Sequence, residues 1–94
     1  MATVYILYSK DIDSYYIGSC KDIEIRLEDH IEKKYKNSYT TRAEDWEVVY
    51  QLNNLSHIQA RNIEAHIKRM KSKKYINDLC KYHEISLKLQ QKYQ

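Results

Sequence analysis

Residues 3–20 decide the fold, and they read TVYILYSKDIDSYYIGSC. The segments TVYILYS (3–9) and SYYIGSC (14–20) are rich in aromatic and β-branched residues, which is typical of strands. The link between them is short and polar, as in the turn of a hairpin. The stretch therefore predicts two antiparallel neighbouring strands.

The second segment contains Gly18, the only glycine in a chain of 94 residues that also has no proline. A lone glycine within a strand marks a bulge or a close approach by another backbone or a ligand. Tyr16 lies two residues earlier and therefore on the same face of the strand. We expect the hairpin to bring Tyr5 close to Tyr16, with Gly18 leaving space beside them.

The rest of the chain predicts helices and a third strand. Asp22 is a suitable N-cap for residues 22–34, in which Ile and Leu recur at four-residue spacing, as in an amphipathic helix. Residues 35–45 are polar and predict a loop, and residues 46–52 (WEVVYQL) predict a strand. The residues expected on one face of that strand are Trp46, Val48, Tyr50 and Leu52.

A second helix is predicted to follow the third strand. Ser56 and Gln59 have the spacing of a capping box, and the apolar pattern continues to Met70. After a break, a last helix is expected from about Tyr75, with apolar residues continuing to Leu89. The order β-β-α-β-α-α indicates a small α+β domain.

We expect a single domain over residues 1–94, with its core at about 3–80 and a C-terminal helix and tail at 75–94. No apolar run approaches the length of a membrane span, and the N-terminus lacks the pattern of a signal peptide. The two cysteines, Cys20 and Cys80, fit neither a zinc site nor a disulfide framework. These features favour a cytoplasmic protein with free thiols and no membrane partner.

The charge is unevenly distributed along the chain. Residues 1–56 carry seven Lys/Arg and ten Asp/Glu, whereas residues 57–94 carry nine Lys/Arg and three Asp/Glu. A basic half suits a polyanion such as nucleic acid, although charge alone favours a solvated helix face. The densest cationic run is Lys68, Arg69, Lys71, Lys73 and Lys74.

Three further residues have side chains suited to phosphodiester hydrolysis. Arg26 and His30 are four residues apart and share a helix face, and Glu64 flanks the apolar stripe of its helix. A carboxylate can hold Mg²⁺, and a guanidinium matches a phosphate in shape. Each also has a purely structural explanation, such as surface exposure or, for Glu64, an ion pair with Lys68.

The ordered set of Val4-Tyr5-Ile6, Tyr16-Ile17-Gly18, Arg26, His30 and Glu64 resembles the GIY-YIG nuclease family. The resemblance covers roughly residues 3–80, and it extends to the small stand-alone bacterial members of that family. It implies a three-stranded antiparallel sheet flanked by helices, the GIY-YIG endonuclease fold.

By this resemblance, Tyr5 is the candidate general base and Tyr16 positions the water or the phosphate. Gly18 leaves space near the scissile phosphate. Cys20 stands where the family usually has threonine, and Val4 stands where the first motif has glycine. Neither substitution removes a residue of the catalytic set.

The resemblance also assigns Arg26 to stabilising the transition state, His30 to assisting proton transfer and Glu64 to holding one Mg²⁺ or Mn²⁺ ion. The residues expected to contact DNA are Lys68, Lys71, Lys73, Lys74 and Asn77. The expected activity is metal-dependent hydrolysis of DNA, with nicking by a monomer or weak dimer. The alternative is a nucleic-acid-binding module with little cleavage that acts with a partner protein. The choice between DNA and RNA, the substrate structure and the pathway, DNA repair among others, are left open.

Overall fold

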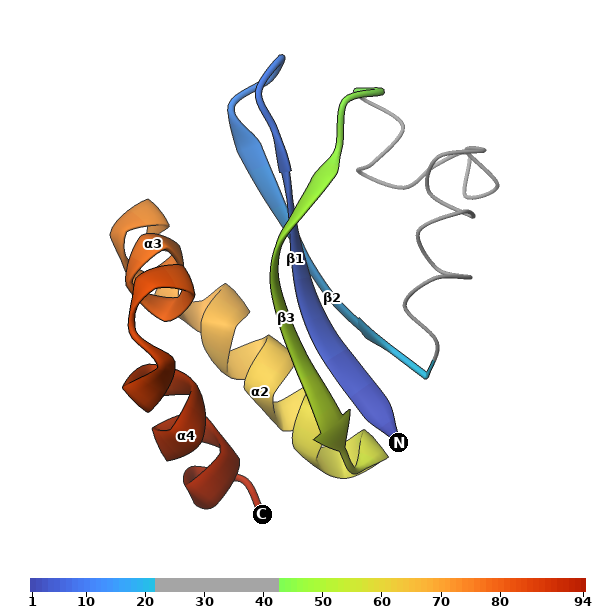
Figure 1. The fold of residues 1–94 in the computed structure, drawn as a ribbon, viewed down its shortest axis with the longest axis vertical. Helices are drawn as coiled ribbons and strands as arrows, with labels where there is room; N and C mark the ends of the chain where they lie inside the picture. The colour runs from blue at the N-terminus through green and yellow to red at the C-terminus, as the bar shows by residue number, and fades with distance from the viewer. Residues whose placement is uncertain (22–42) are drawn as a thin grey trace.

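The computed structural model describes residues 1–21 and 43–94, so the helix predicted at 22–34, with Arg26 and His30, lies outside the described residues. The described elements are, in chain order, β1 (Ala2–Ser9), β2 (Ser14–Cys20), β3 (Glu47–Leu55), α2 (His57–Met70), α3 (Lys73–Lys81) and α4 (His83–Lys92). The strands form one antiparallel sheet in the order β2-β1-β3, which confirms the predicted α+β fold (Figure 1).

The core lies between the sheet and the helices, with β1 as the central, almost fully buried strand. On α2, Ala60, Ile63 and Ile67 are buried at the 3–4-residue spacing of an amphipathic helix. They belong to the same apolar cluster as Val4 and Ile6 of β1. Burial of each large aliphatic side chain contributes about 1.5–3 kcal/mol, so this contact fixes α2 against the sheet.

The ends of α2 follow the sequence signals. The Ser56 hydroxyl accepts a hydrogen bond from the backbone N–H of Gln59, and the Gln59 side chain accepts one from the backbone N–H of Ser56. The helix ends at Lys71, which adopts the left-handed conformation with φ of 46°. No helix in residues 43–94 or in the described N-terminal segment is long and apolar enough to cross a bilayer.

The single last helix predicted from Tyr75 onward is wrong, because the chain forms two helices, α3 and α4, separated at Tyr82. Tyr82 is extended, with φ of −114° and ψ of 103°. In one continuous helix, Ile76 and Leu89 would be separated by about 0.4 of a turn around the helix axis. The break lets both residues reach the same core.

The third strand is longer than predicted and contains an irregularity. Tyr50 pairs with Ile6, but Val48 pairs with Leu7, so the register shifts by one residue between them. Ile6 and Leu7 point to opposite faces of β1. The expectation that Val48 and Tyr50 share one face is therefore wrong, and Val48 is 37% exposed.

Candidate active site

Tyr5 and Gly18 are direct cross-strand partners in the β1–β2 ladder. The register through Gly18 is unbroken, and its φ is not positive, so the glycine serves neither a bulge nor a left-handed turn. A Cβ at residue 18 would lie 2.6 Å from the Tyr5 hydroxyl oxygen and 2.7 Å from Tyr5 Cζ. The glycine is therefore needed because the Tyr5 side chain approaches it closely, whereas the sequence predicted a bulge or an approach by another backbone or a ligand.

Tyr16 lies beside this pair. Its ring centroid is 6.3 Å from that of Tyr5, and its Cε1 would be 3.2 Å from a Cβ at Gly18. Tyr5 is fully buried, whereas Tyr16 is only partly buried. The predicted proximity of the two tyrosines is confirmed, and only Tyr16 reaches the open cavity that follows.

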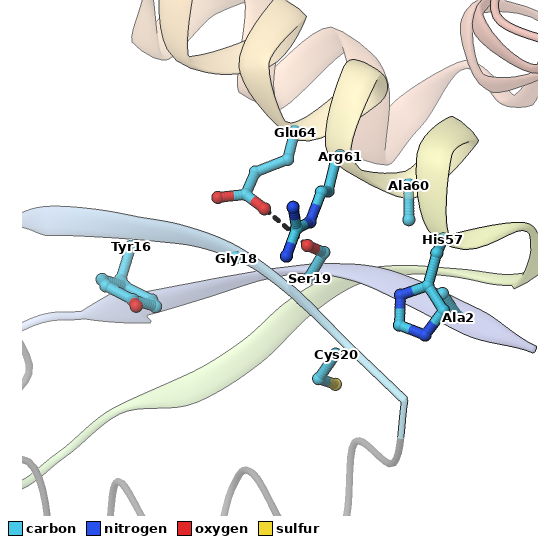
Figure 2. Close-up of a pocket in the computed structure, with 9 residues that line it drawn as sticks. All are labelled: Ala2, Tyr16, Gly18, Ser19, Cys20, His57, Ala60, Arg61 and Glu64. Carbon is cyan, nitrogen blue, oxygen red and sulfur yellow. Dashed lines mark hydrogen bonds between the residues drawn. The ribbon is translucent and has the colours of Figure 1, made fainter.

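A cavity of about 270 Å³ lies between β2, an edge strand of the sheet, and α2. Figure 2 shows Tyr16 and Cys20 on one side of the β2 ribbon, and Glu64 and Arg61 projecting toward it from α2 on the other. The cavity therefore extends around the outer edge of β2. Its lining residues are Ala2, Tyr16, Gly18, Ser19, Cys20, His57, Ala60, Arg61 and Glu64.

Glu64 is the one carboxylate among these lining residues, and both of its oxygens accept hydrogen bonds. Ser19 Oγ donates to Oε1 at 2.5 Å, and Lys68 Nζ donates to Oε2 at 2.6 Å. The Glu64 side chain is 21% exposed, which confirms the predicted position at the edge of the core. The ion pair with Lys68, the structural explanation for this residue, is also present.

The donor set at Glu64 fits a hydrated divalent ion better than a metal enclosed by protein ligands. No group of three or more His, Cys, Asp or Glu residues gathers among residues 1–21 and 43–94. Mg²⁺ commonly binds one or two carboxylates and fills its other positions with water and substrate phosphate oxygens. Glu64 can supply that single carboxylate, and the Lys68 ammonium beside Oε2 would compete with the ion for it.

Three of the four lysines expected to contact DNA are paired with carboxylates. The pairs are Lys68–Glu64 at 2.6 Å, Lys73–Asp13 at 2.9 Å and Lys74–Asp78 at 3.6 Å. Lys71 is exposed at the end of α2. Asn77 accepts a hydrogen bond from the Tyr15 hydroxyl at 3.3 Å, and it does not line the cavity. The structure therefore does not bring Asn77 to Glu64.

Three polar cavity residues were not predicted from the sequence: Ser19, His57 and Arg61. With Glu64, His57 and Arg61 have the i, i+4, i+7 spacing of one helix face. The spacing is visible in the sequence. The edge strand that this face approaches is a tertiary relationship, which local pattern does not reveal.

The comparisons with known proteins agree with this geometry. The model of one protein family, the GIY-YIG catalytic domain, matches residues 1–77. No curated protein and no solved structure matches the chain. The matched range includes both tyrosines, Gly18 and Glu64.

Proposed function

The chain belongs to the GIY-YIG catalytic domain family, a family of nucleases, and we propose that it is a metal-dependent endonuclease that nicks DNA. The observation that carries the proposal is the shared cavity: Tyr16 and Gly18 of β2 and Glu64 of α2 line the same space. A phosphodiester bound there would contact the carboxylate of Glu64, the phenol of Tyr16 and the backbone of Gly18 at the same time.

We assign the general-base role to Tyr5 and the positioning of water or phosphate to Tyr16. The Tyr5 hydroxyl lies against Gly18, and Gly18 lines the cavity, so the hydroxyl adjoins a residue of the cavity wall that carries no side chain. Arg26 and His30 keep the transition-state and proton-transfer roles that their positions in the family motif imply.

Glu64 is the proposed ligand of one Mg²⁺ or Mn²⁺ ion. A divalent ion bound to it would polarise a phosphate oxygen and offset the charge that develops in the transition state. Ser19 orients the Glu64 carboxylate toward the cavity by donating to Oε1. Lys68 balances the carboxylate charge until substrate and ion arrive.

A single active centre cuts one strand at a time, so nicking by a monomer or weak dimer is the expected product pattern. A protein partner would supply DNA specificity, and the cytoplasm is the proposed location. The second candidate function is a nucleic-acid-binding module with little cleavage. It is favoured by the pairing of Glu64 with Lys68, which occupies one carboxylate oxygen.

The test is nicking of supercoiled plasmid with Mg²⁺ or Mn²⁺ against EDTA. Glu64→Gln is compared with wild type and with Glu84→Gln, a matched change at an exposed position of α4. Metal-dependent nicking that is lost in Glu64→Gln and retained in Glu84→Gln supports the endonuclease. DNA binding without nicking in all three proteins would favour the binding module, and equal nicking by all three would remove Glu64 from the mechanism.

A further inference from the structure

Arg61 and His57 extend the cavity beyond Glu64 along α2. Arg61 is three residues from Glu64, and His57 is four residues further toward the N-terminus of the helix. At 1.5 Å per residue, Arg61 lies about 4.5 Å and His57 about 10.5 Å from Glu64 along the helix axis. Figure 2 shows Glu64 and Arg61 directed from α2 toward β2, and His57 directed toward the sheet beside Ala2.

Charge is unevenly balanced among the three α2 side chains that line the cavity. The charge of Glu64 is offset by Lys68 at 2.6 Å. Arg61 and His57 are both exposed, and neither side chain has a hydrogen bond or an ion pair with the residues that the structure describes. Among the described residues that line the cavity, the part beyond Glu64 therefore presents a guanidinium and an imidazole, and the one carboxylate, Glu64, is already paired.

These two side chains suit a phosphate. A guanidinium presents a planar fork of N–H donors that matches phosphate oxygens, and an imidazole can donate one N–H. Successive phosphates of one DNA strand are spaced by at least about 3.4 Å along the duplex axis. One nucleotide step therefore has the same order of length as the step from Glu64 to Arg61.

We propose that Arg61, assisted by His57, binds the backbone phosphate adjacent to the one held at Glu64. This inference rests on the proposed function, because it uses Glu64 to place the scissile phosphate. The site recognises the phosphodiester backbone and not the bases. It directs the bound strand along α2, beside the edge of β2.

Binding can be measured without cleavage. In a Glu64→Gln background, with EDTA present, the full chain is titrated into a fluorescein-labelled 20-base-pair DNA duplex at several salt concentrations. The logarithm of the binding constant falls with the logarithm of salt by about 0.9 for each phosphate contact in B-DNA. Adding Arg61→Gln is expected to weaken binding several-fold and to reduce that slope by about 0.9.

The matched control is Lys88→Gln, which removes one exposed positive charge from α4, away from the cavity. It should change the slope far less than Arg61→Gln does. Arg61→Lys should keep most of the slope and lose part of the affinity, because a single ammonium replaces the fork. In the active protein, Arg61→Gln should raise KM more than it lowers kcat. This is expected for a contact that is made equally in the enzyme–substrate complex and in the transition state.

Two results would overturn the inference, and they can be told apart. If Arg61→Gln and Lys88→Gln change affinity and slope equally, the site is absent, whereas metal-dependent nicking by the wild type still stands. If the Glu64→Gln parent binds no DNA at any salt concentration and the wild type does not nick, the proposed function fails together with the inference. Circular dichroism spectra of the variants should match that of the parent.

Discussion

The hydroxyl of Tyr5 lies 2.6 Å from the point where residue 18 would carry a Cβ, so Tyr5 and Gly18 fit together only because Gly18 has no side chain. Tyr5 is fully buried. Its ring therefore has no open space into which it can move without displacing packed neighbours.

Gly18→Ala is predicted to lower both stability and activity. Forcing a methyl group into a packed site costs about 1–3 kcal/mol, and a displacement of about 1 Å at a reacting group can cost about 10²-fold in rate. Urea unfolding and plasmid nicking measure the two effects. Tyr5→Phe alone removes the hydroxyl without adding bulk, so it should keep the fold while losing turnover.

The double variant Tyr5→Phe/Gly18→Ala separates the two contacts. The phenylalanine lacks the hydroxyl oxygen at 2.6 Å but keeps the ring carbon at 2.7 Å. We expect the alanine to cost less in this background than in wild type, yet still to be destabilising. A wild-type unfolding midpoint for Gly18→Ala would contradict the steric account.

Ser19→Ala is predicted to lower activity with little change in stability. The variant leaves Glu64 Oε1 without the donor that holds it at 2.5 Å. Loss of a residue that orients a metal ligand typically costs about 10–100-fold in metal affinity or activity. Nicking as a function of Mn²⁺ concentration measures this, and Ser19→Thr, which keeps a hydroxyl, should recover much of the loss.

A serine elsewhere on β2 serves as the control for Ser19. Ser14 bonds the carbonyl of Ile12 within the hairpin turn and does not line the cavity. Ser14→Ala should leave the metal dependence of nicking at the wild-type level. If Ser14→Ala and Ser19→Ala lower activity equally, the hydrogen bond to Glu64 has no special role.

Local pattern was enough to predict the hairpin and the position of α2. The alternation around Tyr5 and Tyr16 fixes which side chains share a face, and the capping box fixes the start of α2 at Ser56. These signals span a few residues each, so they can be recognised in the sequence without knowledge of the tertiary contacts.

Features that depend on how distant segments meet were not predictable in the same way. The break at Tyr82 and the register shift beside Val48 both satisfy packing against segments far away in the sequence. The role of Arg61 depends on the approach of α2 to the outer edge of β2. Helix spacing alone cannot identify which side of a helix faces an edge strand.

The stability of the protein is predicted to fall between pH 7.5 and pH 5.5 because of His66. Burial, together with the charges of Lys92 and Arg69, lowers the pKa of His66 below its usual value. Tyr93 accepts a hydrogen bond from Arg69 at 3.3 Å and so can donate its own proton to His66 Nδ1 at 2.9 Å, which favours the neutral imidazole. The Tyr75 ring lies 6.0 Å from that of His66 and adds no charge there.

The sign of this dependence follows from the direction of the shift. The unfolded chain binds a proton at His66 near pH 6.5, whereas the folded chain resists it, so stability falls as the pH drops through that value. Thermal unfolding at pH 7.5, 6.5 and 5.5 should show a smaller decrease for His66→Gln than for wild type. Equal decreases would remove His66 as the cause. The same measurement on Tyr93→Phe would show how much of the pH dependence comes from the hydrogen bond between the Tyr93 hydroxyl and His66.

Lys68→Met is predicted to lower the concentration of Mn²⁺ or Mg²⁺ needed for half-maximal nicking. Lys68 Nζ lies 2.6 Å from Glu64 Oε2 and occupies an oxygen that the proposed metal ion also uses. Methionine keeps an unbranched chain on the exposed helix face, and loss of a surface ion pair costs only about 0–1 kcal/mol. The metal titration of nicking is therefore a measure of the competition at Glu64 and not of folding.

Lys74→Met provides a matched control, because Lys74 makes the same i, i+4 type of pair with Asp78 at 3.6 Å, away from the cavity. It should leave the half-saturating metal concentration unchanged. If Lys68 instead serves chiefly to bind DNA, Lys68→Met would raise KM for DNA and leave the metal dependence as in wild type. That outcome would contradict competition at Glu64, whereas a leftward shift of the metal titration in Lys68→Met alone would establish it.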